Sequence, residues 1–435
     1  MAPLQCYPAY KDSGVKWIGE IPEGWMLRKI KFISKIFNGD SLNENQKKKF
    51  ESDDSEDLAY ISSKDVDINN SSIQYQNGLR IPIFKNKLKV APEDSTLLCI
   101  EGGSAGRKIA FTNQKVCFVN KLACFQINRD NKPKYLFYSI KALLFQTQFK
   151  LAMSGMIGGV AISAINNFTI VVPHLPEQTA IAHFLDEKCS KIDMAVDQKE
   201  KLVKLLKERK QIMIQNAVTK GLNPNAKMKD SMVDWIGQIP EGWEVKRFLY
   251  LFTQSRLPTR PDLGVVTAYR DGQVTLRSNR RLNGYTEAIL EHGYQGVCNG
   301  QLVLNSMDAF EGAIGVSDSD GRCTPEYVVC DPKLQEILPE YFAFLLREMA
   351  LAKYIQVICN AVRQRAVRIR FNNLIHRFLI VPPIDEQIAI VAHIEKETTK
   401  IAKAITLQQK QIEKLKEYKA TLINSAVTGK IKVVQ

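Results

Sequence analysis

The chain has 435 residues, enough for two or three domains, and its 45% hydrophobic and 24% charged residues are the mixture of a globular protein. Lysine and arginine number 60 against 46 acids, and the formal charge of +14 favours a polyanionic partner such as nucleic acid. The nine cysteines form no CxxC pair, and neither a secretion signal nor a long apolar run is present, so we expect a cytoplasmic chain without a metal site or a membrane span.

The sequence contains an internal repeat, with related motifs in its two halves. Residues 12–25, DSGVKWIGEIPEGW, return as DSMVDWIGQIPEGW at residues 230–243, with eleven of the fourteen positions identical. A second pair, PHLPEQ at residues 173–178 and PPIDEQ at 382–387, begins a stretch that stays aligned without a gap for more than forty residues. Each half therefore consists of one globular segment, here called a head, followed by one helix.

The first head is expected within residues 1–175 as a mixed α/β domain with short strands such as 97–100 and a closing helix near 133–149. Residues 131–176 contain no acid. The loop EGGSAGR at 101–107 is a weak match to a phosphate-binding loop, and a simple connection between two strands is the favoured interpretation. The glycines just before residue 160 either let the protein backbone approach the DNA duplex closely or form a plain turn. The candidate DNA-binding residues here are Arg107, Lys108, Lys150, Gly158 and Gly159.

A long helix follows at residues 176–221, because no proline or glycine interrupts residues 177–219 and apolar residues recur every seven positions. The second head, 222–384, repeats the mixed α/β plan. Its residues 302–316 align with 97–111, and Pro339 and Tyr341 align with Pro133 and Tyr135. The second helix and a C-terminal tail occupy 385–435. The expected packing residues of the two helices are Leu185, Ile192, Lys199, Leu206 and Met213, and Ile394, Ile401, Gln408, Leu415 and Leu422.

The second head carries the denser basic signal, since residues 349–384 contain no acid but several arginines. Arginine binds guanine or phosphate bidentately, and glutamine binds adenine in the same way. A solvated basic surface is the alternative for each of these side chains taken singly. The candidate DNA-binding residues of this head are Arg256, Arg277, Arg280, Arg281, Arg363, Gln364, Arg365, Arg368 and Arg370.

Together the elements predict an α+β chain in which two mixed α/β heads, related by a pseudo-twofold axis, are separated by two long helices paired antiparallel as a coiled coil. Lys199 and Gln408 would meet in one polar layer of that pair. Our hypothesis is that this layer fixes the register of the helices, and the alternative is that the lysine merely extends to solvent.

Catalytic motifs do not appear in the sequence. It contains neither the glycine-rich loop and Asn/Asp-Pro-Pro-Tyr/Phe motif of an adenine methyltransferase nor the GxxxxGK[ST] motif of a nucleotide-driven motor. No arrangement for a two-metal nuclease or a Ser/His/Asp hydrolase can be argued. We therefore expect a binding chain without catalysis and without a cofactor of its own.

The repeated blocks resemble one family. YKDSGVKWIGEIPEGW at residues 10–25, with its copy, resembles the opening of target recognition domains in type I restriction-modification specificity subunits. IVVPHLPEQ at 170–178 and LIVPPIDEQ at 379–387 resemble the entries into the two conserved helical regions of that family, although the first is a looser version. The heads also differ by about nine residues in length, which favours an asymmetric target.

The resemblance implies that each head reads one half of a split double-stranded DNA target through the major groove and that the helices set the spacer. It further implies two modification subunits that methylate adenine with S-adenosylmethionine, and restriction subunits that use ATP and Mg. Three alternatives remain: a specificity chain of a type IIB-like or other restriction or anti-phage system, a freestanding enzyme acting on nucleic acid, and a coiled-coil scaffold without a DNA role.

Overall fold

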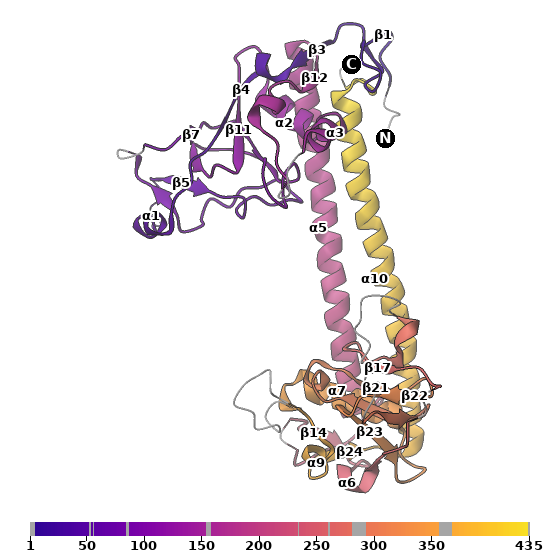
Figure 1. Ribbon diagram of the computed structural model, residues 1–435. Coiled ribbons are helices and arrows are strands. Elements are labelled where there is room, and N and C mark those ends of the chain that lie inside the picture. Colours follow the sequence, from indigo (N-terminus) through magenta and orange to yellow (C-terminus); the bar gives the residue numbers. More distant parts are fainter. Residues whose placement is uncertain are drawn as a thin grey trace. The chain divides into compact units, whose positions relative to one another are not determined.

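The computed structural model describes the chain in two compact units, Met1–Lys201 with Gln408–Gln435, and Leu202–Leu407 (Figure 1). Each unit contains one head and a part of both long helices. The described residues are 5–51, 54, 56–83, 87–153, 158–233, 235–259, 262–280, 293–355 and 368–433.

The first head is built around two four-stranded sheets and two strand pairs. The first sheet has the order β4 (Ser34–Asn38), β11 (Leu122–Ile127), β8 (Thr96–Cys99), β9 (Ile109–Phe111). The second has the order β6 (Arg80–Ile81), β5 (Leu58–Ile61), β10 (Val116–Phe118), β7 (Val90–Ala91). The remaining elements are the hairpin β1 (Tyr10–Asp12) and β2 (Glu20–Pro22), the pair β3 (Met26–Lys29) and β12 (Thr169–Val172), and the helices α1 (Glu44–Lys49), α2 (Pro133–Lys141), α3 (Leu143–Ala152) and α4 (Ile162–Ile165).

The second head repeats the central part of this plan. Its four-stranded sheet has the order β16 (Phe252–Gln254), β23 (Tyr327–Pro332), β20 (Leu302–Asn305), β21 (Ile314–Val316). The strand pairs are β13 (Met228–Asp230) with β14 (Gln238–Pro240), β15 (Glu244–Arg247) with β24 (Phe378–Val381), β17 (Val266–Ala268) with β18 (Val274–Leu276), and β19 (Gln295–Val297) with β22 (Gly321–Cys323). The helices are α6 (Phe248–Leu251), α7 (Pro339–Leu351) and α9 (Phe371–Leu374).

The strand registers show that the sequence alignment of the two heads, residues 97–111 with 302–316, is shifted by one residue for strand β8. Leu97 pairs with Ala110 in the first head, and Val303 pairs with Gly315 in the second. Leu97 is therefore equivalent to Val303, an offset of 206, whereas β9 and β21 keep the offset of 205. The single offset expected for residues 97–111 was wrong for β8, because the loop after this strand is one residue longer in the first head.

The long helices are α5 (Leu175–Lys220) and α10 (Ile384–Val427). They pair antiparallel within the first unit, where Lys419 Nζ lies 2.6 Å from both Asp193 carboxylate oxygens and Lys199 Nζ donates to Gln408 Oε1 at 3.1 Å. All ten expected packing residues are buried or partly buried. The predicted α+β class with two long antiparallel helices is confirmed, and no helix in the described ranges has the length and apolar character to cross a membrane.

Each long helix ends at a glycine that packs against an opening hairpin of its own unit. Gly221 follows α5 and Gly429 follows α10, both with φ of +74°, the left-handed conformation that ends many helices. A Cβ on Gly221 would lie 3.2 Å from Trp243, and one on Gly429 would collide with the ring of Pro22. The end of α10 is thus fixed in the first head and the end of α5 in the second.

Candidate nucleic-acid interface

The repeated sequence blocks form the framework that supports each head. Trp25 Nε1 donates to Glu177 Oε2 at 2.8 Å, and in the second unit Trp243 Nε1 donates to Glu386 Oε2 at the same distance. Both tryptophans are buried, with 1% and 0% exposure. In each unit the tryptophan of the Glu-Gly-Trp motif is thus bonded to the glutamate of the Glu-Gln motif. This bond joins the start of a head to the start of a long helix, which accounts for the presence of both motifs in both halves.

The glutamine next to each of these glutamates makes a second equivalent contact. Gln178 Oε1 accepts the Lys132 backbone N–H, and Gln387 Oε1 accepts the Leu338 N–H, both at 2.9 Å. These amides immediately precede α2 and α7, so one buried side chain ties the closing helix of the head to the long helix.

In the first head, two of the predicted segments lie side by side. Gly102 N donates to Gly158 O at 2.9 Å, and Glu101 and Gly159 form an antiparallel bridge. The loop 101–107 connects β8 to β9, as expected for a connection between strands and not for a nucleotide-binding loop, which opens a helix. Gly158, Gly159 and the 101–107 loop together form one surface that exposes backbone, here called the first-head surface.

The basic residues of the first-head surface differ in how they are used. Arg107 is exposed, and its guanidinium donates to Gly103 O within the same loop. Lys108 Nζ donates to Ser63 O at 2.6 Å, so its ammonium group holds a neighbouring turn. Lys150 is exposed in the last turn of α3. Arg107 and Lys150 are therefore the cations of this set that face solvent most openly.

In the second head, predicted arginines far apart in sequence line the same hollow. Arg256 follows β16 and Arg370 precedes α9, and both line a hollow of about 180 Å³. Arg368 Nε lies 3.0 Å from Glu326 Oε2, and Glu326 lines the same hollow. Sequence reasoning missed the other polar residues that line it. These are Gln254, Ser306, Tyr327 and Asn372.

This hollow, here called the second-head surface, corresponds in place to the first-head surface. Val160 N donates to Ile100 O at 3.0 Å, and Ile369 N donates to Ser306 O at 3.1 Å. In each head the segment before α4 or α9 is thus joined to the loop that follows β8 or β20. Gly159 stands where the second head has Arg368, so equivalent places carry a bare backbone in one head and a cation in the other.

Arg277 and Arg280 belong to a neighbouring part of the second head, at the end of β18. Arg277 Nε donates to Thr267 Oγ1 at 3.3 Å. Arg280 Nη1 lies 2.9 Å from Asp271 Oδ2, and its guanidinium stacks 4.1 Å from the centre of the Tyr269 ring. Both arginines therefore have partners within the head.

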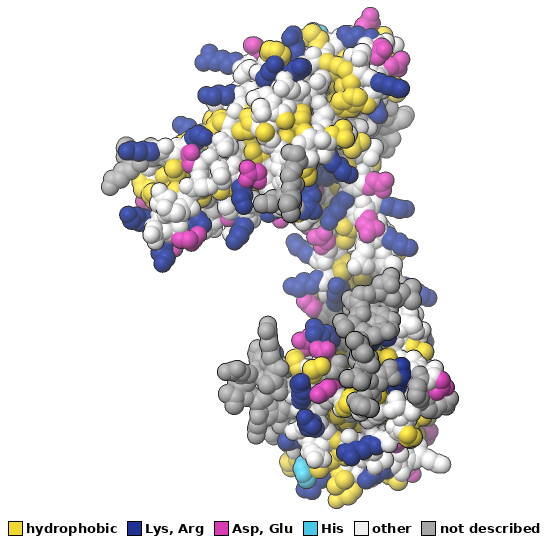
Figure 2. All heavy atoms as spheres, viewed as in Figure 1, with side chains coloured by type: hydrophobic (Ala, Val, Ile, Leu, Met, Phe, Trp, Pro, Cys, Tyr) yellow, Lys and Arg dark blue, Asp and Glu magenta, His cyan; other side chains and the backbone are white. Residues whose placement is uncertain are grey.

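Four predicted residues, Arg281, Arg363, Gln364 and Arg365, lie outside the described residues. Figure 2 shows lysine and arginine side chains spread over the visible face of each unit, with acidic side chains between them. Within the described ranges, no three His, Cys, Asp or Glu side chains converge as metal ligands would. The described surfaces of the two heads present hydrogen-bonding groups and positive charge, which can bind the phosphates and base edges of DNA.

Sequence comparisons agree with this framework. A family model for the type I restriction modification DNA specificity domain matches residues 22–204. The chain is 24% identical to the putative type I restriction enzyme MjaX specificity subunit of Methanocaldococcus jannaschii, with 98% of each chain covered. It is 21% identical to the type I restriction enzyme EcoKI specificity subunit of Escherichia coli strain K12, over 87% of this chain and 83% of that one.

Two solved structures share the fold. One, from work on complex assembly and conformational transition of the type I R-M system, has a TM-score of 0.65 at 15% identity and covers 94% of this chain and 99% of its own. The other, the HsdS subunit from Thermoanaerobacter tengcongensis, has a TM-score of 0.52 at 15% identity and covers 94% and 98%. With its duplicated framework and its two different surfaces, the chain is similar over most of its length to type I restriction enzyme specificity subunits, and its residues 22–204 match the type I restriction modification DNA specificity domain.

Proposed function

We propose that each head reads one half of a bipartite DNA target and that the two long helices set the spacer between the halves. The observation that carries this proposal is the equivalence of the two surfaces. The same framework presents the segments before α4 and α9 next to the loops after β8 and β20, yet the residues on them differ. One plan with two different surfaces is suited to reading two different half-sites.

The chain itself supplies recognition and no catalysis in this proposal. Two modification subunits would methylate one adenine in each half-site with S-adenosylmethionine, and restriction subunits would use ATP and Mg. Adenine methylation requires the base to leave the stack, which an enzyme bound beside each reading head can accomplish. The names of the relatives, all type I specificity subunits, support this division of labour.

Methylome sequencing of a host that carries this chain with its modification partner tests the proposal. We expect a motif in two parts, with one modified adenine in each part. Exchange of residues 244–381 for the second head of a relative should change one half of the motif and leave the other half and the spacer as they were. A change in both halves, or the absence of any motif, would contradict the two-headed reader.

The salt dependence of binding tests the second-head surface separately. Each lost phosphate contact should reduce the slope of log K against log salt by about 0.9. We expect Arg256→Ala and Arg370→Ala each to lower duplex affinity. Lys246→Ala is the matched control, because this lysine pairs with Glu244 on the framework strand β15. Equal slopes for wild type and both arginine variants would remove phosphate binding from this surface.

A further inference from the structure

Each head contains a partly buried cation at the same place in its closing helix. Lys141 ends α2, and Arg347 lies in α7. The offset of 206 that relates Pro133 to Pro339 also relates these two residues. The Tyr135 hydroxyl donates to Val427 O at 3.2 Å and the Tyr341 hydroxyl to Val218 O at 2.8 Å. Both carbonyls lie at the same place near the end of a long helix, so α2 and α7 are equivalent in packing as well as in sequence.

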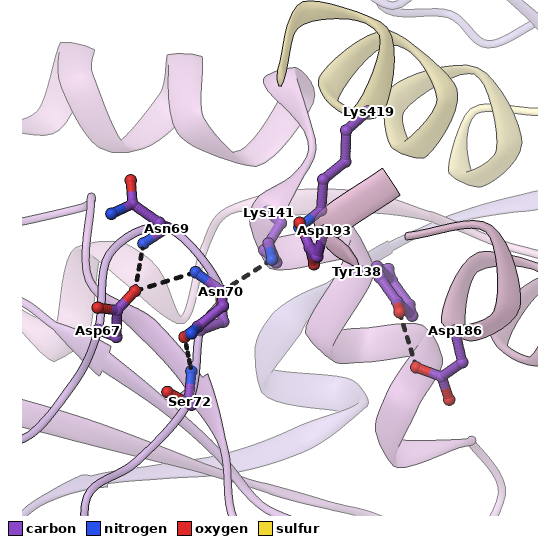
Figure 3. Close-up of polar contacts among 10 residues, drawn as sticks. Asp67, Asn69, Asn70, Ser72, Tyr138, Lys141, Asp186, Asp193 and Lys419 are labelled. Atoms are coloured by element: carbon purple, nitrogen blue, oxygen red, sulfur yellow. Dashed lines mark hydrogen bonds and ion pairs between the residues drawn. The ribbon is translucent and has the colours of Figure 1, made fainter. Parts of the chain in front are cut away.

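Lys141 reaches the tip of a hairpin loop in the first head. Its Nζ lies 2.9 Å from Ser71 Oγ, in the loop 67–72 (Figure 3). Val66 and Ile73 bridge the two sides of this loop, and Ser71 has a φ of +61°, which is uncommon for a residue with a side chain. Beside the contact lies a hollow of about 400 Å³, lined by the loop, Lys141 and the two long helices.

Arg347 reaches the hairpin β17–β18 in the second head. Its Nη2 donates to Arg270 O at 3.4 Å, just beyond the end of β17. A Cβ on Gly272, whose φ is +92°, would collide with the Arg347 guanidinium. The hairpin β17–β18 is closed by a hydrogen bond from Tyr269 N to Gln273 O at 2.9 Å. In both heads, therefore, a loop residue with positive φ meets the cation of the closing helix.

Burial of the Lys141 and Arg347 charges lowers the stability of the folded heads. Burial lowers the pKa of Lys141 to about 8, and burial also lowers the pKa of Arg347. The described contacts of the Lys141 ammonium are the Ser71 hydroxyl and the Phe137 ring, 4.9 Å from its centroid. Among the described residues, Arg347 Nε is buried without a hydrogen-bond partner. Because burial disfavours a charged group, stability alone does not account for a cation at this place in both heads.

The hairpins that they hold lead to the reading surfaces. In the second head, the Ala268 backbone at the end of β17 hydrogen-bonds the Tyr327 hydroxyl, and Tyr327 lines the hollow with Arg256 and Arg370. In the first head, the turn before the hairpin is held by Lys108, the residue that follows the 101–107 loop. Movement of either hairpin would therefore displace groups of the surface beside it.

We propose that Lys141 and Arg347 are equivalent positioning residues, each holding the hairpin of its own head in the orientation that recognises one half-site. The proposal rests on the proposed function, since it takes the two surfaces to read DNA. It assigns to the cations a role in recognition and not in stability.

The test uses Lys141→Met and Arg347→Met in the full chain with its partner subunits. Hydrogen exchange should become about ten-fold faster in the loop 67–72 for the first variant and in residues 269–273 for the second, the factor expected for loss of one hydrogen bond to a charged group. The melting temperature should not fall, because a costly charge is removed. Lys134→Met is the matched control on α2, since Lys134 pairs with Asp186 and not with the hairpin.

Recognition is measured by selection from a pool of random-sequence duplexes. Each methionine variant should lose base preference in one half of the selected motif and keep it in the other. Lys141→Arg and Arg347→Lys, which exchange the two cations, should restore the preference. A bipartite wild-type motif that both methionine variants select unchanged, with unchanged exchange rates, overturns the positioning role alone. A wild-type chain that selects no motif overturns the proposed function and this role together.

Discussion

Glu348 provides a quantitative test of the packing between α5 and the second head. Its side chain is buried, with the residue 6% exposed, and Gln211 Nε2 on α5 lies 2.6 and 2.8 Å from the two carboxylate oxygens. Burial raises the pKa of Glu348 from 4.5 to about 7, against the smaller opposing effects of the Gln211 hydrogen bond and the nearby Arg347 charge. The folded second unit therefore carries a carboxyl group that resists ionisation.

The sign of the pH dependence follows from this shift. The unfolded chain loses the proton near pH 4.5 and the folded chain near pH 7, so the folded state binds more protons between these values. The contribution to stability is present below pH 4.5 and is lost as the pH rises through 7. A difference of about 2.5 pH units corresponds to about 3 kcal/mol.

Glu348→Gln removes the titration, nearly keeps the shape of the side chain and retains one acceptor oxygen for Gln211 Nε2. We expect the variant to be about 3 kcal/mol more stable than wild type at pH 8 and to approach wild type near pH 4.5. Urea unfolding between pH 4.5 and 8, followed by hydrogen exchange of α7 peptides, measures this difference in the second unit. Glu336→Gln, an exposed position, is the control. A stability difference that stays constant across this pH range would refute the reasoning.

Four further substitutions probe the framework and the first-head surface. Gly429→Ala should cost roughly 2–4 kcal/mol in thermal unfolding, because its Cβ meets a proline ring in a left-handed conformation, whereas Gly221→Ala should cost about 1 kcal/mol; equal losses would contradict the packing described. Trp243→Phe removes the hydrogen bond to Glu386 and should destabilise the second unit by about 2 kcal/mol, with exchange rates in the first unit unchanged. Lys108→Met should lower stability by about 1–2 kcal/mol while the salt slope of DNA binding stays the same, and a shallower slope would show that this lysine contacts phosphate.

The framework could be predicted in part, because its motifs are duplicated in the sequence. The repeated motifs mark the start of each head and of each long helix, and the helices follow from uninterrupted heptads that end before Gly221 and Gly429. The hydrogen bonds that join the two motifs required the structure, because their residues are 152 and 143 positions apart. Which helix ends pack on which head required the structure, because the first unit combines residues more than 200 positions apart.

The surfaces could be predicted only as a set of basic residues. Charge alone did not distinguish Arg256 and Arg370, which line one hollow, from Lys108, whose ammonium holds a backbone carbonyl. The search for basic clusters also missed Arg347, which lies just before the acid-free residues 349–384 and was not among the candidates. The use of a cation depends on the acceptors that the fold brings to it, and these come from distant segments.

The discontinuity of the first unit has a consequence for synthesis on the ribosome. Leu422, Ile423, Ala426 and Val427 of α10 belong to the same hydrophobic core as the first head. The second unit is continuous in sequence and is translated in full before residue 408 is made. The head encoded first is therefore completed last. Until then the part of its apolar core that α10 covers stays open, and a frameshift after residue 407 would remove core residues of the first head while sparing the second unit.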